Sequence, residues 1–382
     1  MENFVMYNPT ILHFGTDVVN GLENIISGYG KRVLLITGNG SVVRSGLLQK
    51  VHDQLRNDGL ETFEYRGIKP NPVIEDVDAA AALGRKHNVD VILAIGGGSV
   101  IDSAKIISIT IPVDHSGWDF YSGKAKPKTS VPLIAILTLA ATGTEMNPFA
   151  VLSNHKTNEK NGWGHPLLYP RHSFLDPHYT LSVPENYTAY GIADLIAHSL
   201  EAWFGAGDAT LSDRFIISII KEAIESGPML LRDLQSYELR EKIMYAATNA
   251  LNGLTLYGKK SGDWGVHSIG HVLSLLYDIP HGASLTIAYP AWMKHLQYPA
   301  GKRIEELGNA LWGVTTIGET INHMTRLFEE LHCPVKLQQV NILPDQKQRI
   351  LDTMISNTIS GNNFKLGPDD YPALIDLMAD ME

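Results

Sequence analysis

The chain has 382 residues, 44% of them hydrophobic and 19% charged, so it is long enough for two or three domains and too apolar to be disordered. Its formal net charge of −10, without a run of Lys or Arg, argues against nucleic acids and anionic membranes as partners. A single cysteine, Cys333, excludes an internal disulfide framework and favours a reducing compartment.

Targeting and membrane signals are not evident in the sequence. The first residues, "MENFVMYNPT", lack a basic segment followed by an apolar one, so no signal peptide is predicted. The longest apolar run, within "VPLIAILTLAATG", is too short to cross a bilayer and is typical of a buried strand. We therefore expect a soluble protein of the cytoplasm.

In chain order, the first half alternates strand and helix patterns. The patterns predict strands at 32–37, 62–65 and 131–137, another within 89–99 that runs into glycines, and helices near 47–55, over 74–88 and from 100 onward. Such alternation is typical of βαβ units and a mostly parallel sheet. After about residue 184 strand patterns become scarce, and long helical patterns cover 189–204, 211–227 and 238–254. We therefore expect an α/β domain over residues 1–183 and an all-helical domain over 184–382.

Two glycine-containing turns follow predicted strands. In "AIGGGSVID" (94–102) the glycines allow close approach of a phosphate to a helix N-terminus, where the dipole favours an anion. The same stretch can be an ordinary tight turn in which Ser99 and Asp102 form a capping box, and the two interpretations are compatible. The turn "TGNGSVVRSG" (37–46) lacks both a G-x-G-x-x-G pattern and an acidic residue placed to bind a ribose. Its small polar residues and Arg44 leave room and charge for a 2′-phosphate, which favours NADP(H) over NAD(H).

A third candidate segment, "TLAATGTEMN" (138–147), follows the fourth predicted strand with several hydroxyl side chains. It is either an ordinary polar loop or a loop that contacts a cofactor. Because ligands bind at the carboxyl ends of parallel strands in α/β proteins, its position favours the second interpretation.

Polar side chains interrupt two apolar helical patterns in the second half. In "GIADLIAHSLEA" (191–202), Asp194 and His198 share one face of a helix that is apolar nearly all round, where an unpaired carboxylate would be costly. The stretch "DWGVHSIGHVLSLLYDIPHGASL" (263–285) holds His267, His271 and His281. A lone histidine among apolar residues is usually part of the core. The whole set instead favours one divalent metal ion, with Zn(II) and Fe(II) both compatible with imidazole and carboxylate ligands.

These motifs, in this order and spacing, resemble the iron-containing (group III) alcohol dehydrogenases over essentially the whole chain. Within that family the sequence is most similar to the NADP(H)-dependent butanol dehydrogenase and aldehyde reductase branch. The resemblance implies a dehydroquinate-synthase-like fold. In such a fold an N-terminal Rossmann-type parallel-sheet domain binds the dinucleotide, a helical domain binds the metal, and catalysis takes place in the cleft between them.

The resemblance also implies roles for particular residues. The metal ligands would be Asp194, His198, His267 and His281, and His271 would be a proton relay beside them. The implied cofactor contacts run from the 2′-phosphate region through the pyrophosphate to the ribose and nicotinamide: Gly38, Asn39, Ser41, Gly97, Gly98, Ser99, Asp102, Thr138, Thr142 and Lys160. Asn39 departs from the glycine of the closest NADP-using relatives, and NAD-preferring members tend to have Asp at the position of Gly38.

We therefore expect a homodimeric, metal-dependent enzyme that interconverts a primary alcohol such as butanol and its aldehyde with NADP(H), with NAD(H) as the second choice. A glycerol-type polyol dehydrogenase is an alternative, although its pocket should offer more hydroxyl partners. A lyase like dehydroquinate synthase is less favoured, because it needs a basic cluster where the residues between His267 and His281 are apolar. A non-catalytic binding protein would not need the full set of acid and histidine residues.

Overall fold

The computed structural model of the protein describes residues 1–379 and comprises two compact units, residues 7–183 and residues 1–6 together with 184–382. The first unit contains a parallel sheet with helices, and the second is helical, which confirms the expected fold class. The first six residues belong to the helical unit, where the N–H of Glu2 donates to the carbonyl of Gly258 (2.8 Å). Within the described residues, no helix is long and apolar enough to cross a membrane.

The α/β unit is built on a six-stranded sheet with the order β1-β8-β5-β4-β2-β3, in which all neighbours are parallel. Its strands are β1 (Ile11–Phe14), β2 (Arg32–Gly38), β3 (Glu61–Ile68), β4 (Val91–Gly96), β5 (Leu133–Leu137) and β8 (His172–Leu175). The central strands β4 and β5 are buried along their whole length, as expected where helices cover both faces. The four predicted strands correspond to β2, β3, β4 and β5.

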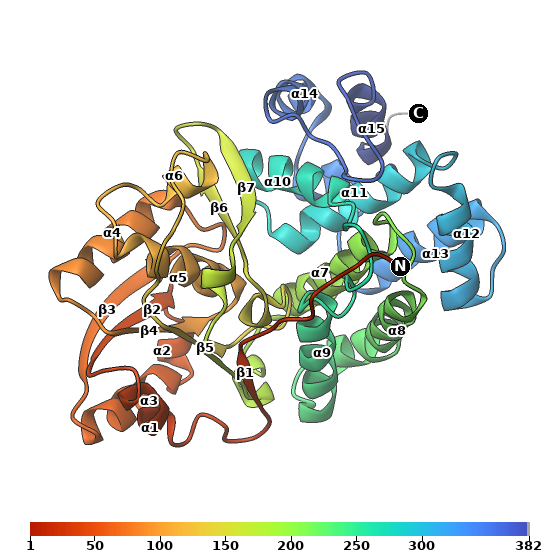
Figure 1. The fold of residues 1–382 in the computed structure, drawn as a ribbon. Helices are drawn as coiled ribbons and strands as arrows, with labels where there is room; N and C mark the ends of the chain where they lie inside the picture. Colours follow the sequence, from red (N-terminus) through yellow and green to blue (C-terminus); the bar gives the residue numbers. More distant parts are fainter. Residues whose placement is uncertain (380–382) are drawn as a thin grey trace. The chain divides into compact units, whose positions relative to one another are not determined.

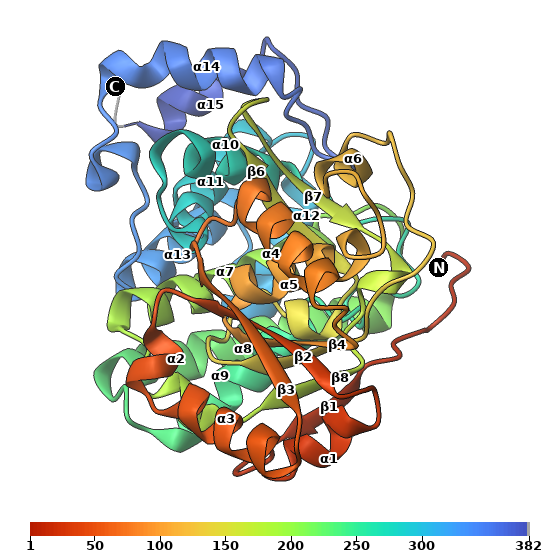
Figure 2. The same ribbon diagram turned by 90° about the vertical axis from the view of Figure 1, so that its left-hand side faces the viewer.

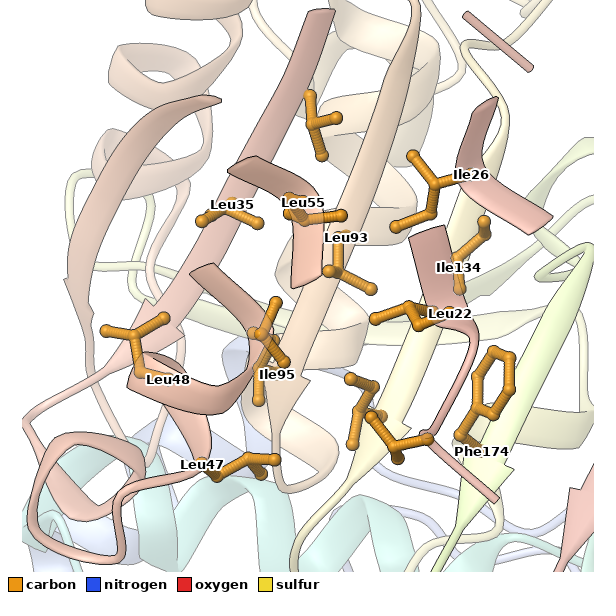
Figure 3. Close-up of a cluster of buried hydrophobic side chains, with 14 of the residues drawn as sticks. Leu22, Ile26, Leu35, Leu47, Leu48, Leu55, Leu93, Ile95, Ile134 and Phe174 are labelled. Carbon is orange, nitrogen blue, oxygen red and sulfur yellow. The ribbon is translucent and has the colours of Figure 1, made fainter. Parts of the chain in front are cut away.

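Helices cover the two faces of this sheet (Figures 1 and 2). One face carries α1 (Leu22–Ser27), α2 (Ser41–Arg44) and α3 (Leu47–Asn57), and the other carries α4 (Ile74–Lys86) and α5 (Gly98–Thr110). Figure 3 shows the apolar cluster under α1 and α3, where their leucines and isoleucines pack on strand residues such as Leu35, Leu93 and Phe174. Alternate side chains of the same strands face α4 and α5, so helices bury both faces of the central strands.

A separate antiparallel hairpin, β6 (Phe149–Asn154) and β7 (Glu159–Gly164), completes the α/β unit together with the short helix α6 (Trp118–Tyr121). Short 3-10 turns lie at η1 (Thr144–Met146), η2 (Pro166–Leu168) and η3 (Pro177–Thr180). The strand patterns predict neither the hairpin nor the four-residue strands β1 and β8. These strands are short, and β7 contains two glycines, so the period-2 pattern is weak.

The helical unit consists of α7 (Glu185–Trp203), α8 (Thr210–Arg232), α9 (Tyr237–Ala250), α10 (Gly265–Tyr277), α11 (His281–His295), α12 (Gly301–Trp312), α13 (Ile317–Glu330), α14 (Lys347–Ser356) and α15 (Tyr371–Met378), with 3-10 turns η4 (Leu337–Val340) and η5 (Pro344–Gln346). Helix α7 packs against α8, α9 and α11 (Figure 1), and every residue from Gly191 to Trp203 is buried. The interpretation of this segment as a buried helix is thereby confirmed. Helix α8 continues beyond its predicted end through Pro228, where Gly227 packs on Ile192 and Leu331 and tertiary contacts outweigh local propensity.

Candidate metal centre

Three helices of the second unit carry the polar side chains that the sequence singles out. Asp194 and His198 lie one turn apart on α7, His267 lies in the first turn of α10, and His281 is the first residue of α11. Between α10 and α11 the chain reverses, with Asp278 in the left-handed region (φ 52°) and Pro280 capping α11. Because α10 and α11 pack together, the rings of His267 and His281 come within 5.3 Å of each other, centroid to centroid.

The imidazole nitrogens surround one carboxylate oxygen. Oδ1 of Asp194 lies 3.4 Å from Nδ1 of His198, 4.0 Å from Nε2 of His267 and 3.8 Å from Nε2 of His281. The ligand atoms of Asp194, His267 and His281 all lie within 4.8 Å of one another. His198 is not part of that mutual set, but its ring centroid lies 4.6 Å from that of His267. The structure therefore brings together all four side chains that the sequence proposes as ligands.

The chemistry of this cluster fits a divalent cation. Nδ1 of His198 and Nε2 of His267 are buried and have no hydrogen-bond partner within residues 1–379, although such atoms are normally satisfied. Burial lowers the pKa of His198 to about 4 and that of His267 to about 3, so both rings are kept neutral, the form that binds metals. Ligand atoms about 2.1 Å from a tetrahedral ion lie roughly 3.4 Å apart, and the distances from Oδ1 of Asp194 to the three imidazole nitrogens are 3.4 to 4.0 Å.

His271 lies beside the cluster, one turn beyond His267 on α10. Its ring centroid is 6.5 Å from that of His267 and 5.3 Å from that of His281. It is half-buried, whereas His267 is buried. This position next to the proposed ligands agrees with the expectation that His271 is a neighbour of the centre.

The position of His281 depends on the close approach of the backbones of α11 and α7. A Cβ atom on Gly282 would lie 2.2 Å from the carbonyl oxygen of Tyr190, so any larger residue would push the start of α11 away from α7. Only glycine allows the first turn of α11 to lie this close to the helix that carries Asp194. The sequence "PHG" therefore combines a proposed ligand with the residue that lets it approach.

Sequence reasoning missed two buried carboxylates in this unit. Glu201 lies on α7, in the stretch "AHSLEA", and its carboxyl group lies 2.7 Å from Nδ1 of His267. Asp263 lies just before α10. Burial raises the pKa of Glu201 to about 8 and that of Asp263 to about 6. Glu201 could have been singled out from the sequence, because an acidic residue three positions after His198 on a buried helix needs a partner just as Asp194 does.

In the α/β unit the structure brings the "AIGGG" turn together with the loop after β5. Strand β4 ends at Gly96, Gly97 caps α5, and Gly98 is its first residue. A Cβ on Gly98 would lie 2.8 Å from Oγ1 of Thr142, and the N–H of Thr138 donates to the carbonyl of Gly96 (3.0 Å). The glycines thus let the loop after β5 pack closely against the N-terminus of α5, the kind of helix end that suits a phosphate group.

The capping-box interpretation of Ser99 and Asp102 is wrong. Ser99 lies inside α5, and its hydroxyl donates to the carbonyl of Pro70. The buried carboxylate of Asp102 instead accepts from the hydroxyl of Thr144 (2.5 Å) and from the N–H of Val151 (2.9 Å). Its partners are tertiary, so a local Ser-x-x-Asp spacing could not reveal them; Asp102 ties α5 to η1 and β6.

The remaining proposed cofactor contacts lie at the end of β2 and on β7. Gly38 ends β2, Asn39 and Ser41 are exposed, and α2 begins at Ser41 after Gly40 in a left-handed conformation (φ 100°). The ammonium of Lys160 on β7 donates to Oδ1 of Asn71 (2.7 Å), next to the Pro70 that Ser99 contacts. Lys160 and Ser99 therefore both reach the segment between β3 and α4.

A parallel sheet with a glycine turn at a strand end, joined in one chain to a helical unit with an Asp–His cluster, is the combination expected of an enzyme that uses a nucleotide and a metal ion. Family models agree: "Iron-containing alcohol dehydrogenase" matches residues 9–177, and "Fe-containing alcohol dehydrogenase family, C-terminal" matches 188–371. The chain belongs to the iron-containing alcohol dehydrogenase family and is an NAD(P)-dependent alcohol dehydrogenase. The resemblance stated from the motifs is confirmed.

Similar proteins cover nearly the whole chain. Probable NADH-dependent butanol dehydrogenase 2 of Bacillus subtilis (strain 168) is 40% identical and covers 98% of this chain and 99% of the relative. The NADPH-dependent aldehyde reductase YqhD of Escherichia coli (strain K12) is 33% identical, with 90% of both chains covered. The crystal structure of NADH-dependent butanol dehydrogenase A from Thermotoga maritima superimposes with a TM-score of 0.95 at 33% identity and 99% coverage of both chains.

Proposed function

We propose that the protein interconverts a primary alcohol such as butanol and the corresponding aldehyde with NADP(H), using one divalent cation, Fe(II) or Zn(II), held by Asp194, His198, His267 and His281. The observation that carries the proposal is that three imidazole nitrogens, one each from His198, His267 and His281, lie 3.4 to 4.0 Å from Oδ1 of Asp194. When bound, such a cation supplies Lewis-acid polarisation of a substrate oxygen.

The choice of a simple alcohol over a polyol rests on the relatives. Two of them, 38% and 40% identical over 98% of this chain, are named probable butanol dehydrogenases. We therefore prefer a monofunctional alcohol or aldehyde to glycerol as the substrate.

His271 is our candidate for the proton relay. It lies 5.3 Å from the ring of His281, and its half-buried position can connect a buried centre to water. The role of this side chain is to hold a proton for the substrate oxygen and to exchange it with solvent, which imidazole does near neutral pH.

The preference for NADP(H) rests on the end of β2. Gly38 and Asn39 place no acid where the adenosine ribose of a bound dinucleotide is expected, and the exposed Arg44 supplies positive charge nearby. The relatives differ in the coenzyme that their names give: the butanol dehydrogenases of Bacillus subtilis are named NADH-dependent, and YqhD is named NADPH-dependent. The residues of this chain therefore carry the proposal.

Replacing Gly38 by Asp is expected to weaken NADPH binding more than NADH binding. The new carboxylate would face the 2′-phosphate, and repulsion between charged groups in contact amounts to ~1–3 kcal/mol. The fold tolerates the change, because a Cβ at Gly38 would make contacts of 3.4 Å or longer. Dissociation constants of both coenzymes, measured by fluorescence on wild type and Gly38→Asp, decide it. An unchanged ratio of the two constants would refute the placement.

We also propose a homodimer joined through the edge strand β1. The opposite edge, β3, carries the charges of Glu61, Glu64 and Arg66, which discourage pairing with another strand, whereas β1 reads "ILHF" and exposes Ile11. Light scattering should give twice the chain mass of 42.0 kDa, and Ile11→Lys should give the mass of one chain. A monomeric wild type would contradict the proposal.

The function is tested with a panel of substrates. Protein loaded with Fe(II) or Zn(II) is assayed with butanal, glyceraldehyde, butanol and glycerol, each with both coenzymes. We expect the highest kcat/KM for butanal with NADPH. A clear preference for glycerol or glyceraldehyde would favour the polyol dehydrogenase instead.

The single cysteine, the buried Cys333, and the use of a reduced nicotinamide coenzyme support a cytoplasmic location.

A further inference from the structure

A buried carboxylate that is not a proposed ligand contacts His267 of the candidate metal centre. Glu201 follows Asp194 by seven residues on α7 and is 1% exposed. Its Oε1 lies 2.7 Å from Nδ1 of His267 and 3.0 Å from the backbone N of the same residue. Its Oε2 accepts the N–H of Trp264 at 2.5 Å. One carboxylate thus holds both the ring and the backbone of His267.

The contact to the ring selects one tautomer. A neutral imidazole carries a single N–H. Both oxygens of Glu201 already accept backbone N–H groups, so the carboxyl group is placed as an acceptor here although burial raises its pKa, and the ring N–H belongs on Nδ1. The lone pair then lies on Nε2, the atom that faces Oδ1 of Asp194 at 4.0 Å. In the other tautomer, Nδ1 would present its lone pair to the carboxylate and Nε2 would have no lone pair for a metal.

The contacts to the backbone fix where helix α10 begins. Trp264, its N-cap, has a φ of 67°, a strained conformation for a bulky residue, and Glu201 accepts the N–H of this residue. The N–H of His267 belongs to the first turn of α10, where unpaired donors and the helix dipole favour a negative charge. Glu201 therefore also sets the position of His267 along α10.

We propose that Glu201 is a positioning residue of the metal centre: it fixes the tautomer and the ring orientation of His267 so that Nε2 is directed at the cation. The inference rests on the metal centre proposed above. Carboxylate–histidine–metal arrangements of this kind tune metal affinity, and loss of the outer carboxylate typically costs about 10- to 100-fold.

Asp263 provides a matched control for a purely structural role. It is also 1% exposed, and it accepts N–H groups at the same helix start, from Gly265 (3.2 Å), and in the loop after α14, from Asn363 (2.9 Å) and Phe364 (2.7 Å). The partners of its carboxylate are thus backbone groups rather than an imidazole. Glu201→Gln and Asp263→Asn each replace one buried carboxylate by an amide of the same size.

The experiment measures the Zn(II) affinity of the full-length protein by competition with a chelator, together with the melting temperature. We expect Glu201→Gln to weaken Zn(II) binding about 10- to 100-fold. Asp263→Asn should lower the melting temperature but keep wild-type affinity. Equal affinity of Glu201→Gln and wild type, or an equal loss in both variants, would overturn the positioning role. A wild type that binds no Zn(II) would instead overturn the metal centre itself, and the inference with it.

A second measurement does not depend on the folding of a variant at Glu201. In metal-free wild-type protein labelled with ¹⁵N-histidine, ring nitrogen shifts report the tautomer, and the signal of His267 is assigned by its loss in His267→Asn. We expect a protonated Nδ1 and an unprotonated Nε2. A proton on Nε2 would overturn the inference.

Discussion

Replacing Asp194 by alanine is expected to remove the bound metal ion and the reduction of butanal together, while the protein stays folded. Three imidazole nitrogens lie within 4.0 Å of Oδ1 of Asp194, and Asp194 is the anionic residue among the four proposed ligands. Loss of a ligand should cost more than the ~100-fold in affinity that loss of an outer partner can cost. Alanine is the strongest helix former, so α7 should persist.

Metal analysis of the purified variant and its circular dichroism spectrum check this expectation. His267→Ala should behave in the same way. The matched control is Ser199→Ala on the same buried helix, because within residues 1–379 the hydroxyl of Ser199 donates to the carbonyl of Leu195 (2.9 Å) in its own helix and contacts no proposed ligand through a hydrogen bond. Full metal content in Asp194→Ala, or equal metal loss in the Ser199 control, would contradict the assignment.

Replacing His271 by alanine is expected to slow turnover ~10²–10⁴-fold while metal content and coenzyme binding stay at wild-type levels. The ring centroid of His271 lies 5.3 Å from that of His281 and 6.5 Å from that of His267, and we do not propose it as a ligand, so its removal should affect proton transfer rather than metal binding. Single-turnover kinetics with butanal and NADPH, alongside metal analysis, separate these effects.

His295→Ala serves as the control for this prediction. His295 ends α11 and is hydrogen-bonded to Asp370 (2.9 Å), so its loss should leave turnover unchanged. Metal loss in His271→Ala would make His271 a ligand, and an unchanged rate would make it a packing residue. Either result would end the relay proposal.

The parts of the fold that could be predicted from sequence are those with a strong local pattern. The buried strands β2, β4 and β5 are short continuous apolar runs, and the helix that carries Asp194 and His198 is a longer one, so both kinds of segment stand out locally. Strands β1 and β8 have four residues each, too few for a period to emerge, and the hairpin β6–β7 lies outside the main sheet. Pairing with distant strands, not local sequence, makes these segments extended.

The candidate site shows the same division between local and distant information. The i, i+4 spacing places Asp194 near His198, and "PHG" predicts the turn that returns His281, so these neighbours follow from helix geometry. Glu201 is 66 residues from His267, and the partners of Asp102 lie 42 and 49 residues away. Which distant group satisfies a buried carboxylate is decided by tertiary packing, so spacing alone could not assign either contact.

Removal and restoration of the metal ion show whether the reduction of butanal depends on it. The wild-type protein is stripped with a chelator, assayed for butanal-dependent oxidation of NADPH, reloaded with Fe(II) or Zn(II), and assayed again. We expect activity to be lost on stripping and to return with about one equivalent of metal per chain, the number that one such ligand set can hold. Stripped protein that reduces butanal as fast as reloaded protein would contradict this expectation.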